Sequence, residues 1–325
     1  MKLSKKAVTT FYLILVFILA ACSGGEQTTS KVEGKSGGAG DKKVIGISLQ
    51  NFSDEFRTYM IDAMKEEEKN HPDFKFMYSD AQNDSAKQMN QIENFIAQKV
   101  DAIIFTPVDT VAAVDILARV NEAGIPIIVS NQTFDGVEDA TAYVGSESIE
   151  SGLLQMEKVA KLLDGKGNIA IMHGQMGHEA EIMRTDGNKE IIAKNPGMKV
   201  VLEDTAEWNR EKGLTLMENW LHSGKKIDAV VANNDEMAIG AIMALEADGK
   251  LDEVIVAGVD ATPAALEFMQ SGKLEVTVFQ DAIGQGVGSI QTAVKAANGE
   301  PVEDVIVPYK LVTPDNVEEY AEIYK

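Results

Sequence analysis

The chain has 325 residues, with 30 lysines and arginines against 51 aspartates and glutamates, so its formal net charge at pH 7 is −21. A surface this acidic repels phosphate backbones and anionic lipid headgroups, which argues against a nucleic-acid-binding protein. The single cysteine excludes an internal disulfide framework.

The N-terminal segment has the features of a secretory signal. Three lysines precede an apolar run, Phe11 to Ala21, that is too short to span a bilayer. Leu19-Ala20-Ala21-Cys22 resembles the bacterial lipobox, in which the cysteine is lipidated; an ordinary signal peptide with a chance cysteine is the alternative. We therefore predict a lipoprotein signal peptide over residues 1–21, lipidation of Cys22, a flexible tether over residues 22–42 and an extracytoplasmic protein anchored to the membrane.

From Lys43 onward, short apolar runs alternate with segments of helical period. The predicted strands are Val44–Leu49, Phe74–Tyr78, Ala102–Phe105, Ile127–Val129, Ala142–Val144, Ile169–Met172, Lys199–Leu202, Ala229–Ala232, Val254–Ala257 and Val276–Phe279. Strand and helix in alternation predict right-handed βαβ crossovers and parallel sheets covered on both faces.

The length of this region favours two domains. About 280 residues exceed the usual single-core size of roughly 100–200 residues. The segment Lys99–Phe105 followed by Asp109 is also echoed by Lys226–Ala232 followed by Asp235. The sequence thus predicts an α/β protein with two doubly wound parallel-sheet lobes, although the shared packing rules of βα units could produce the echo by chance.

Polar side chains follow the predicted strands at their carboxyl ends, where open α/β sheets bind ligands. The candidates chosen on this ground are Gln50, Asn51, Phe52, Phe56, Asn131, Gln132, Asn234, Asp260 and Gln280. Amides with one carboxylate bind hydroxyls well but make poor nucleophiles, so we expect a recognition site and no enzyme. For each residue taken singly, a cap or turn role is an equal alternative.

Two further side chains suit a hydroxylated ring. Trp208 lies outside the apolar stripe that places Trp220 in the core, and its indole could lie against the C–H face of a sugar. The fork of donors on Arg184 would suit two adjacent hydroxyls, with a surface charge as the alternative. For Phe52 and Phe56, a hydrophobic staple at a helix start is the alternative.

No segment of the sequence matches a known catalytic, cofactor-binding or metal-binding motif well. In Gly284-Gln-Gly-Val-Gly288 the third glycine of a dinucleotide loop is replaced by Ser289, so these glycines are interpreted as helix-packing residues. His173, His178 and Glu179 match no zinc spacing and are interpreted as part of a loop with two solvated histidines. We expect no cofactor and no metal.

Three segments resemble the sugar-binding proteins of ABC importers, the ribose/galactose type of periplasmic binding protein. They are Ala232–Ala241, Gly258–Pro263 and Val276–Asp281, and the resemblance extends from about Val44 to the end of the chain. It implies a two-lobed clamp with a three-segment hinge that crosses near Gly145, Phe279 and Tyr309. The implied lobes are residues 43–145 plus 280–308 and residues 146–279 plus 309–325.

The resemblance also implies a ligand and partners. Ribose-binding members have Asp-Arg where this chain has Asn131-Gln132. In contrast, residues 83–109, 207–210 and 217–221 look closest to members that bind inositol or rhizopine. We therefore expect an inositol-like cyclitol to bind by lobe closure, with ribose or another aldose, or a sensory receptor domain for a sugar or furanosyl signal, as alternatives. The implied partners are a membrane permease and its cytoplasmic ATPase, and the chain is expected to be a monomer. The implied ligand-binding residues are Phe52, Phe56, Asn131, Gln132, Arg184, Trp208, Asn234, Asp260 and Gln280.

Overall fold

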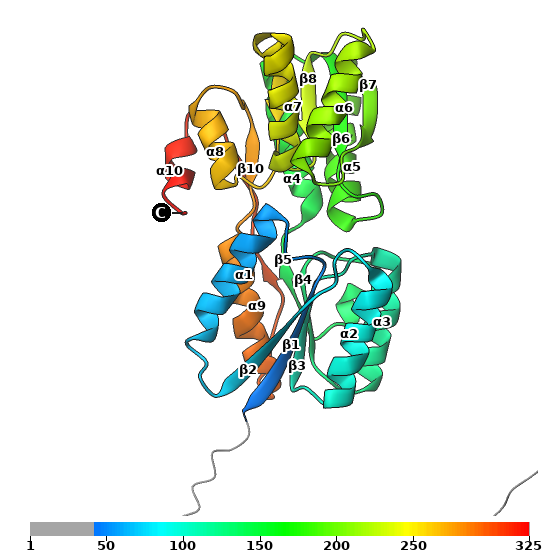
Figure 1. Ribbon diagram of the computed structural model, residues 1–325, viewed down its shortest axis with the longest axis vertical. Helices are drawn as coiled ribbons and strands as arrows, with labels where there is room; N and C mark the ends of the chain where they lie inside the picture. The colour runs from blue at the N-terminus through cyan, green and yellow to red at the C-terminus, as the bar shows by residue number, and fades with distance from the viewer. Residues whose placement is uncertain (1–41, 325) are drawn as a thin grey trace, which may run out of the picture. The chain divides into compact units, whose positions relative to one another are not determined.

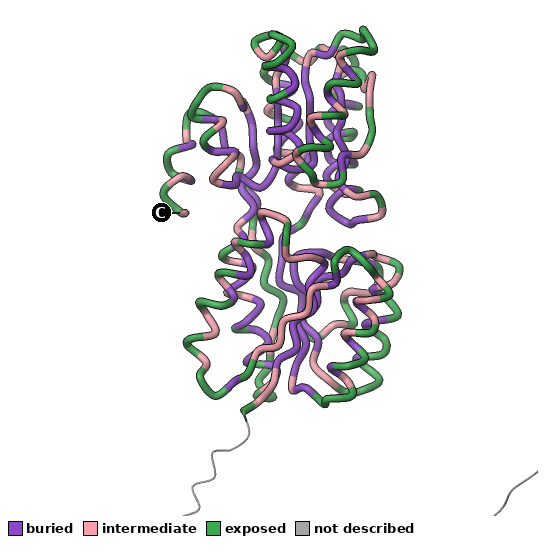
Figure 2. Tube along the Cα trace, in the orientation of Figure 1, coloured by how far each residue is buried: buried purple, intermediate pink, exposed green. Residues whose placement is uncertain are grey.

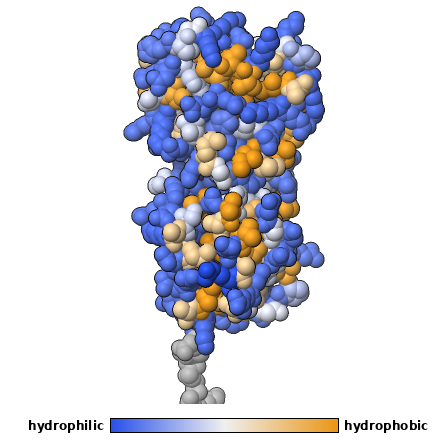
Figure 3. Space-filling view, turned by 90° about the vertical axis from the view of Figure 1, so that its right-hand side faces the viewer, coloured by the Kyte–Doolittle hydropathy of each residue, from blue (hydrophilic) through white to orange (hydrophobic). Residues whose placement is uncertain are grey.

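The structure, a computed structural model, describes residues 42–324. The predicted signal peptide, the lipidation site Cys22 and residues 22–41 of the predicted tether lie outside these residues. None of the described helices combines the length and the apolar character that crossing a bilayer requires. One face of the described region is largely hydrophilic, with apolar residues gathered in separate patches (Figure 3).

The first sheet has six strands in the order β11-β5-β4-β3-β1-β2, and every neighbouring pair is parallel. Helices cover both faces, with α1 and α9 on one side and α2 and α3 on the other (Figure 1). The strands are β1 Lys43–Leu49, β2 Phe74–Asp80, β3 Ala102–Phe105, β4 Ile127–Asn131, β5 Ala142–Gly145 and β11 Val305–Ile306. The helices are α1 Glu55–Glu68, α2 Ser85–Gln98, α3 Thr110–Glu122 and α9 Ala282–Ala297, with a 3₁₀ turn at Val137–Asp139.

The second sheet has the order β7-β6-β8-β9, again with parallel neighbours. Its strands are β6 Lys166–His173, β7 Gly197–Thr205, β8 Ala229–Ala232 and β9 Ile255–Ala257. Its helices are α4 Ser148–Leu162, α5 Glu179–Lys194, α6 Arg210–His222, α7 Asp235–Asp248, α8 Pro263–Gln270 and α10 Val317–Ala321, with a 3₁₀ turn at Leu251–Glu253. The antiparallel pair β10 Thr277–Phe279 and β12 Lys310–Val312 lies beside this sheet, since Val276 bridges to Ala257.

The central strand β8 shows why its sequence is apolar throughout. Ala229 and Val231 pack under α4 and α5, whereas Val230 and Ala232 pack into the larger core under α6 and α7. Successive side chains of a strand point to opposite faces, so a strand covered on both faces needs apolar residues at every position. The strands form the buried interior of both lobes, and the outer helix faces are exposed (Figure 2).

The chain passes between the two lobes three times. β5 is followed by α4 of the second lobe, β10 is followed by α9 of the first lobe, and β11 is followed by β12. Gly145, Phe279 and Tyr309 therefore lie at or next to these passages. The lobe boundaries given in the sequence analysis, and the hinge role of the three segments, remain predictions.

Every predicted strand is present, with ends that differ by a few residues. The short strands β11 and β12 were not predicted. The interpretation as a helix-packing glycine is confirmed for Gly286, because a Cβ there would lie 2.5 Å from the carbonyl oxygen of Met60 in α1; a Cβ on Gly288 would instead meet Val144 of β5 at 3.1 Å. Trp220 is buried in the second-lobe core, as expected.

Candidate ligand-binding site

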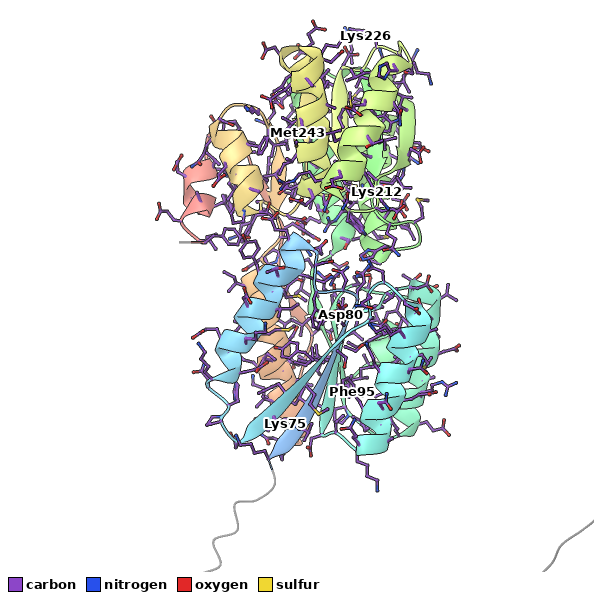
Figure 4. The ribbon with its side chains drawn as sticks, in the orientation of Figure 1. Lys75, Asp80, Phe95, Lys212, Lys226 and Met243 are labelled. Atoms are coloured by element: carbon purple, nitrogen blue, oxygen red, sulfur yellow. The ribbon has the colours of Figure 1, made fainter. Side chains whose placement is uncertain are left out.

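A narrow cavity lies between the carboxyl ends of the two sheets. Figure 4 shows this polarity on β2, where Lys75 lies at the end far from the second lobe and Asp80 at the end near it. The residues that line the cavity are Gln50, Asn51, Asp54, Phe56, Arg57, Asn131, His178, Ala180, Arg184, Trp208, Asn234, Asp260 and Gln280.

Most of the expected ligand residues meet in this one wall. Gln50 follows β1, Asn131 ends β4, and Asn234 caps α7 by accepting a hydrogen bond from the amide of Met237 at 3.0 Å. These positions follow from the parallel sheets, whose strand ends converge on the same edge. The expected residues in the wall are Phe56, Asn131, Arg184, Trp208, Asn234, Asp260 and Gln280. Contact of each with a ligand remains a prediction.

The structure does not bring Phe52 or Gln132 into the wall. The side-chain oxygen of Asn51 accepts the amides of Ser53 and Asp54, and the Phe52 ring packs edge-on against Tyr78 at 6.4 Å between centroids. Gln132 is buried and donates from Nε2 to Oε1 of Gln50 at 3.0 Å. It therefore supports a wall residue from outside the cavity.

Arg57 is a wall residue that the sequence analysis missed. It is only 5% exposed, and its guanidinium donates to Oε1 of Gln50 and, from Nη1 at 3.5 Å, to Oδ1 of Asn131. Burial lowers the pKa of Arg57, and the charges of Asp54 and Asp260 act against this shift. No pattern in the sequence distinguished it from a surface arginine one residue after Phe56.

The interpretation of His173 and His178 as solvated was wrong, because both are buried. His173 Nδ1 lies 2.8 Å from Oε1 of Glu181. His178 Nε2 lies 2.9 Å from Oε1 of Gln50, which belongs to the other lobe, and its ring contacts Trp208 at 5.0 Å between centroids. The loop before α5 therefore folds into the space between the lobes.

Arg184 organises the second-lobe side of the cavity. Nη1 donates to the carbonyl of Asn233 at 2.6 Å, and Nη2 donates to Oε1 of Gln280 at 2.7 Å and to the Tyr309 hydroxyl at 3.3 Å. Its guanidinium carbon also lies 5.8 Å from the Trp208 ring centroid, within range of a cation–π contact. One side chain thus fixes groups from three separate segments.

Asp260 is the buried carboxylate of the wall. It is 5% exposed and lies 3.5 Å from Nη1 of Arg184. Burial raises the pKa of Asp260 well above its ordinary value, and the positive charge of Arg184 partly offsets the shift. Its hydroxyl-accepting oxygen atoms are therefore held in a place from which water is largely removed.

Three wall residues have backbone conformations that side chains rarely adopt. The φ angles are 71° at Asn131, 63° at Trp208 and 122° at Asp260. Such conformations cost about 1–3 kcal/mol each and persist where the surrounding structure imposes them. Their concentration around one cavity is typical of a functional site.

Five buried side-chain atoms of the wall have no hydrogen-bond partner within the protein. They are Gln50 Nε2, Arg57 Nε, His178 Nδ1, Arg184 Nε and Trp208 Nε1. Leaving a buried polar atom unpaired costs about 1–3 kcal/mol. Hydroxyl groups of a small molecule are suitable partners for atoms of this kind. Within residues 42–324, no cluster of histidine, cysteine and acidic side chains is suited to hold a metal.

A group of charges bridges the lobes beside the cavity. Arg210 in α6 donates from Nε to Glu236 in α7 at 3.0 Å, and its Nη2 lies 3.8 Å from Glu55 in α1 of the other lobe. Burial raises the pKa of Glu55 to about 8, and Glu236 acts in the same direction through a hydrogen bond and its charge. Glu55 therefore keeps its proton near neutral pH.

We expect this arrangement to make stability depend on pH. Folded Glu55 keeps its proton up to about pH 8, whereas the unfolded chain loses it near the ordinary value of 4.5. The folded state binds more protons in this window, so the stabilisation is fully present below about pH 4.5 and is lost as the pH rises through 8. Urea unfolding of wild type and Glu55→Gln should show the variant gaining relative stability from pH 5 to pH 8.

A stability difference between these two chains that stays constant over that range would contradict the prediction. Glu66→Gln is the control, since Glu66 lies on the same helix with its side chain 74% exposed.

Comparison with known proteins agrees with this geometry. A family profile described as "Periplasmic binding protein domain" matches residues 45–301. A Rhizobium meliloti protein named for rhizopine binding is 44% identical over 289 residues, covering 87% of this chain and 94% of that protein. The ribose import binding protein of Bacillus subtilis (strain 168) is 31% identical over 312 residues, covering 95% of this chain and 99% of that protein.

A solved structure is more similar still. The ABC transporter solute-binding protein from Bacillus halodurans C-125, with bound myo-inositol, is 68% identical with a TM-score of 0.86, and the match covers 88% of this chain and 99% of that one. The profile and these relatives each span most of the chain. It therefore belongs to the periplasmic binding protein family, whose members are extracytoplasmic solute-binding proteins.

Proposed function

We propose that this chain is the substrate-binding component of an ABC importer and binds an inositol-like cyclitol, with myo-inositol as the first candidate. The observation that carries the proposal is the set of five unpaired polar atoms in one buried cavity, next to the Asp260 carboxylate and the Trp208 ring. A cyclitol has hydroxyls around its rim and C–H groups on its faces. The hydroxyls can bind the polar atoms of the wall, and a C–H face can pack against the Trp208 ring. The bound myo-inositol of the 68% identical protein supports the same choice.

The proposed mechanism is capture by closure of the lobes. The unpaired atoms come from both lobes, with Gln50 and Arg57 on one side and Arg184 and Trp208 on the other. A ligand bound to one lobe alone makes only part of the hydrogen bonds, so it binds the closed state more tightly than the open state and shifts the hinge equilibrium. The closed form then delivers the ligand to a membrane permease driven by a cytoplasmic ATPase.

The remaining parts of the proposal concern anchoring and assembly. The lipobox-like sequence before Cys22 supports a lipid anchor on the extracytoplasmic side of the membrane. The chain acts as a monomer and has no enzymatic activity, because the wall consists of groups that bind hydroxyls without a nucleophile paired to a base.

Binding of an aldose such as ribose is the second candidate function. The 31% identical ribose import protein favours it. Asn131 and Gln132 replace the charged pair of ribose-binding members, but Arg57 brings a guanidinium to Gln50 and Asn131 from another element. A sensory role for a sugar or furanosyl signal uses the same cavity and differs only in the membrane partner.

A ligand panel tests the proposal directly. Thermal unfolding should be measured with myo-inositol, scyllo-inositol, ribose, galactose and a linear polyol, since a ligand that binds only the folded state stabilises it by RT ln(1 + [L]/Kd). We expect the inositols to raise Tm most. A larger shift with ribose would favour the aldose function, and no shift with any cyclitol would overturn the proposal.

Tryptophan fluorescence should report the ligand through one residue. Trp208 lines the cavity and Trp220 is buried in the second-lobe core, so only Trp208 changes its surroundings on binding. We expect Trp208→Phe to remove the change in emission caused by saturating myo-inositol. Trp220→Phe is the matched control and should keep it. If Trp208→Phe retains the full change, the indole does not face the ligand.

A further inference from the structure

One unpaired atom in the wall differs in kind from the other four. Gln50 Nε2, Arg57 Nε, Arg184 Nε and Trp208 Nε1 are hydrogen-bond donors. The fifth atom, Nδ1 of His178, donates or accepts according to the tautomer of the ring. Whether Nδ1 donates or accepts therefore depends on the groups that contact the ring.

The neighbours of His178 determine the tautomer. Arg57 and Gln50 are linked by a hydrogen bond, and a guanidinium can only donate, so the Gln50 atom in that contact is the carbonyl oxygen Oε1. His178 Nε2 lies 2.9 Å from the same oxygen, so Nε2 carries a hydrogen and donates it. The ring is then either the Nε2–H tautomer or the imidazolium cation.

Electrostatics excludes the cation. The imidazole is buried, and the charges of Arg57 and Arg184 both act on it, so the pKa of His178 lies well below its ordinary value. A neutral ring with hydrogen on Nε2 has a free lone pair on Nδ1. The buried Nδ1 atom is thus an acceptor that finds no donor within the protein.

We propose that His178 is a specificity-determining residue that accepts a hydrogen bond from a ligand hydroxyl at Nδ1 while Nε2 donates across the cleft to Gln50. This inference rests on the proposed function, since it requires a hydroxylated ligand in the same cavity. It adds a chemical requirement, because the ligand group at this position must carry a hydrogen. A hydroxyl meets it, whereas the ring oxygen of a pyranose or a methylated hydroxyl does not.

Two substitutions separate the two nitrogen atoms of the ring. In His178→Gln the side-chain amide reaches the position of Nε2 and keeps a donor to Gln50, but the Nδ1 acceptor is lost. In His178→Asn the side-chain oxygen takes the position of Nδ1 and keeps an acceptor, but the bond across the cleft is lost. A merely structural role as a lobe contact would make the Asn variant the weaker binder.

We expect isothermal titration with myo-inositol to show about tenfold weaker binding for His178→Gln, which corresponds to one hydrogen bond and the unpaired group it leaves. His178→Asn should bind myo-inositol much more tightly than His178→Gln does, with an affinity close to that of wild type. Inositols that lack one hydroxyl, or carry one O-methyl group, should identify a single ring position that pairs with Nδ1. Modification at this position should weaken binding to the wild-type protein about tenfold and leave binding to His178→Gln unchanged. Thermal unfolding of both variants checks that they fold.

A second readout follows the ring itself. In ¹⁵N-labelled protein, the signals absent from His178→Gln identify His178, and exposed His222 serves as the reference histidine. We expect an Nε2–H tautomer whose Nδ1 resonance shifts on addition of myo-inositol. Wild-type affinity in His178→Gln, or a hydrogen found on Nδ1 in the complex, would overturn the proposal. A wild-type chain that binds no cyclitol would instead overturn the proposed function, and this role with it.

Discussion

Replacing Asp260 with alanine is expected to weaken binding of myo-inositol by at least about 100-fold while the chain still folds. The carboxylate lies in the cavity wall, 5% exposed, and its charge would strengthen hydrogen bonds from two ligand hydroxyls. Hydrogen bonds to a charged group contribute about 1.5–3 kcal/mol each, so losing two of them accounts for the change. Isothermal titration calorimetry measures it.

Two controls make this result specific. Asp62→Ala removes a carboxylate that is 68% exposed and does not line the cavity, so the affinity of this variant should equal that of wild type. Asp260→Asn keeps the size and hydrogen-bonding groups of the side chain and removes the charge, so we expect an intermediate loss. Wild-type affinity in Asp260→Ala would show that the ligand does not contact this carboxylate.

Arg184→Met should lower the free energy of unfolding by about 3–5 kcal/mol and abolish binding. The substitution leaves Asp260 buried without its cationic partner, and it removes the donors that hold Gln280 and the Asn233 carbonyl. Breaking a buried ion pair from one side costs this much, because the partner is left either as an uncompensated charge or with a proton that it must take up. Urea unfolding with a linear extrapolation measures the change.

Arg119→Met is the matched control on the surface. Arg119 pairs with Glu93 at 2.9 Å, but the two side chains are 54% and 48% exposed. Exposed ion pairs contribute about 0–1 kcal/mol, so this variant should unfold almost like wild type. Equal losses in the two variants would contradict the view that Arg184 stabilises the protein through a buried network.

The fold could be predicted from the sequence because its strands are buried on both faces. The run Ala229–Ala232 is apolar at every position since each residue enters one of two cores, and such runs stand out between amphipathic helices. β11 could not be predicted in this way. Its residues Val305 and Ile306 are exposed at the sheet edge and lack any periodic signal.

One part of the site was predictable because its residues lie at the carboxyl end of a strand or within two residues after it, and Arg184 and Trp208 were predicted from their side-chain chemistry. Asn131, Asn234 and Gln280 occupy such positions, and the topology alone brings them together. Gln132 does not line the cavity as predicted, because the left-handed backbone at Asn131 turns the Gln132 side chain towards Gln50. Arg57 was missed because its burial depends on contacts with Gln50 and Asn131 at the ends of two other strands, and His178 because it contacts Gln50 of the other lobe; no local pattern in the sequence records either contact.

The order of the elements has a consequence for biosynthesis. Helix α9 packs on α1 and on β3, β4 and β5, yet it begins at Ala282, long after strands β1 to β5 and helices α1 to α3 of the first lobe have been made. A growing chain that ends before this helix leaves the apolar face of α1 uncovered. The first lobe therefore cannot complete its core until translation is nearly finished, whereas the four-stranded sheet of the second lobe and helices α4 to α8 are already made by then.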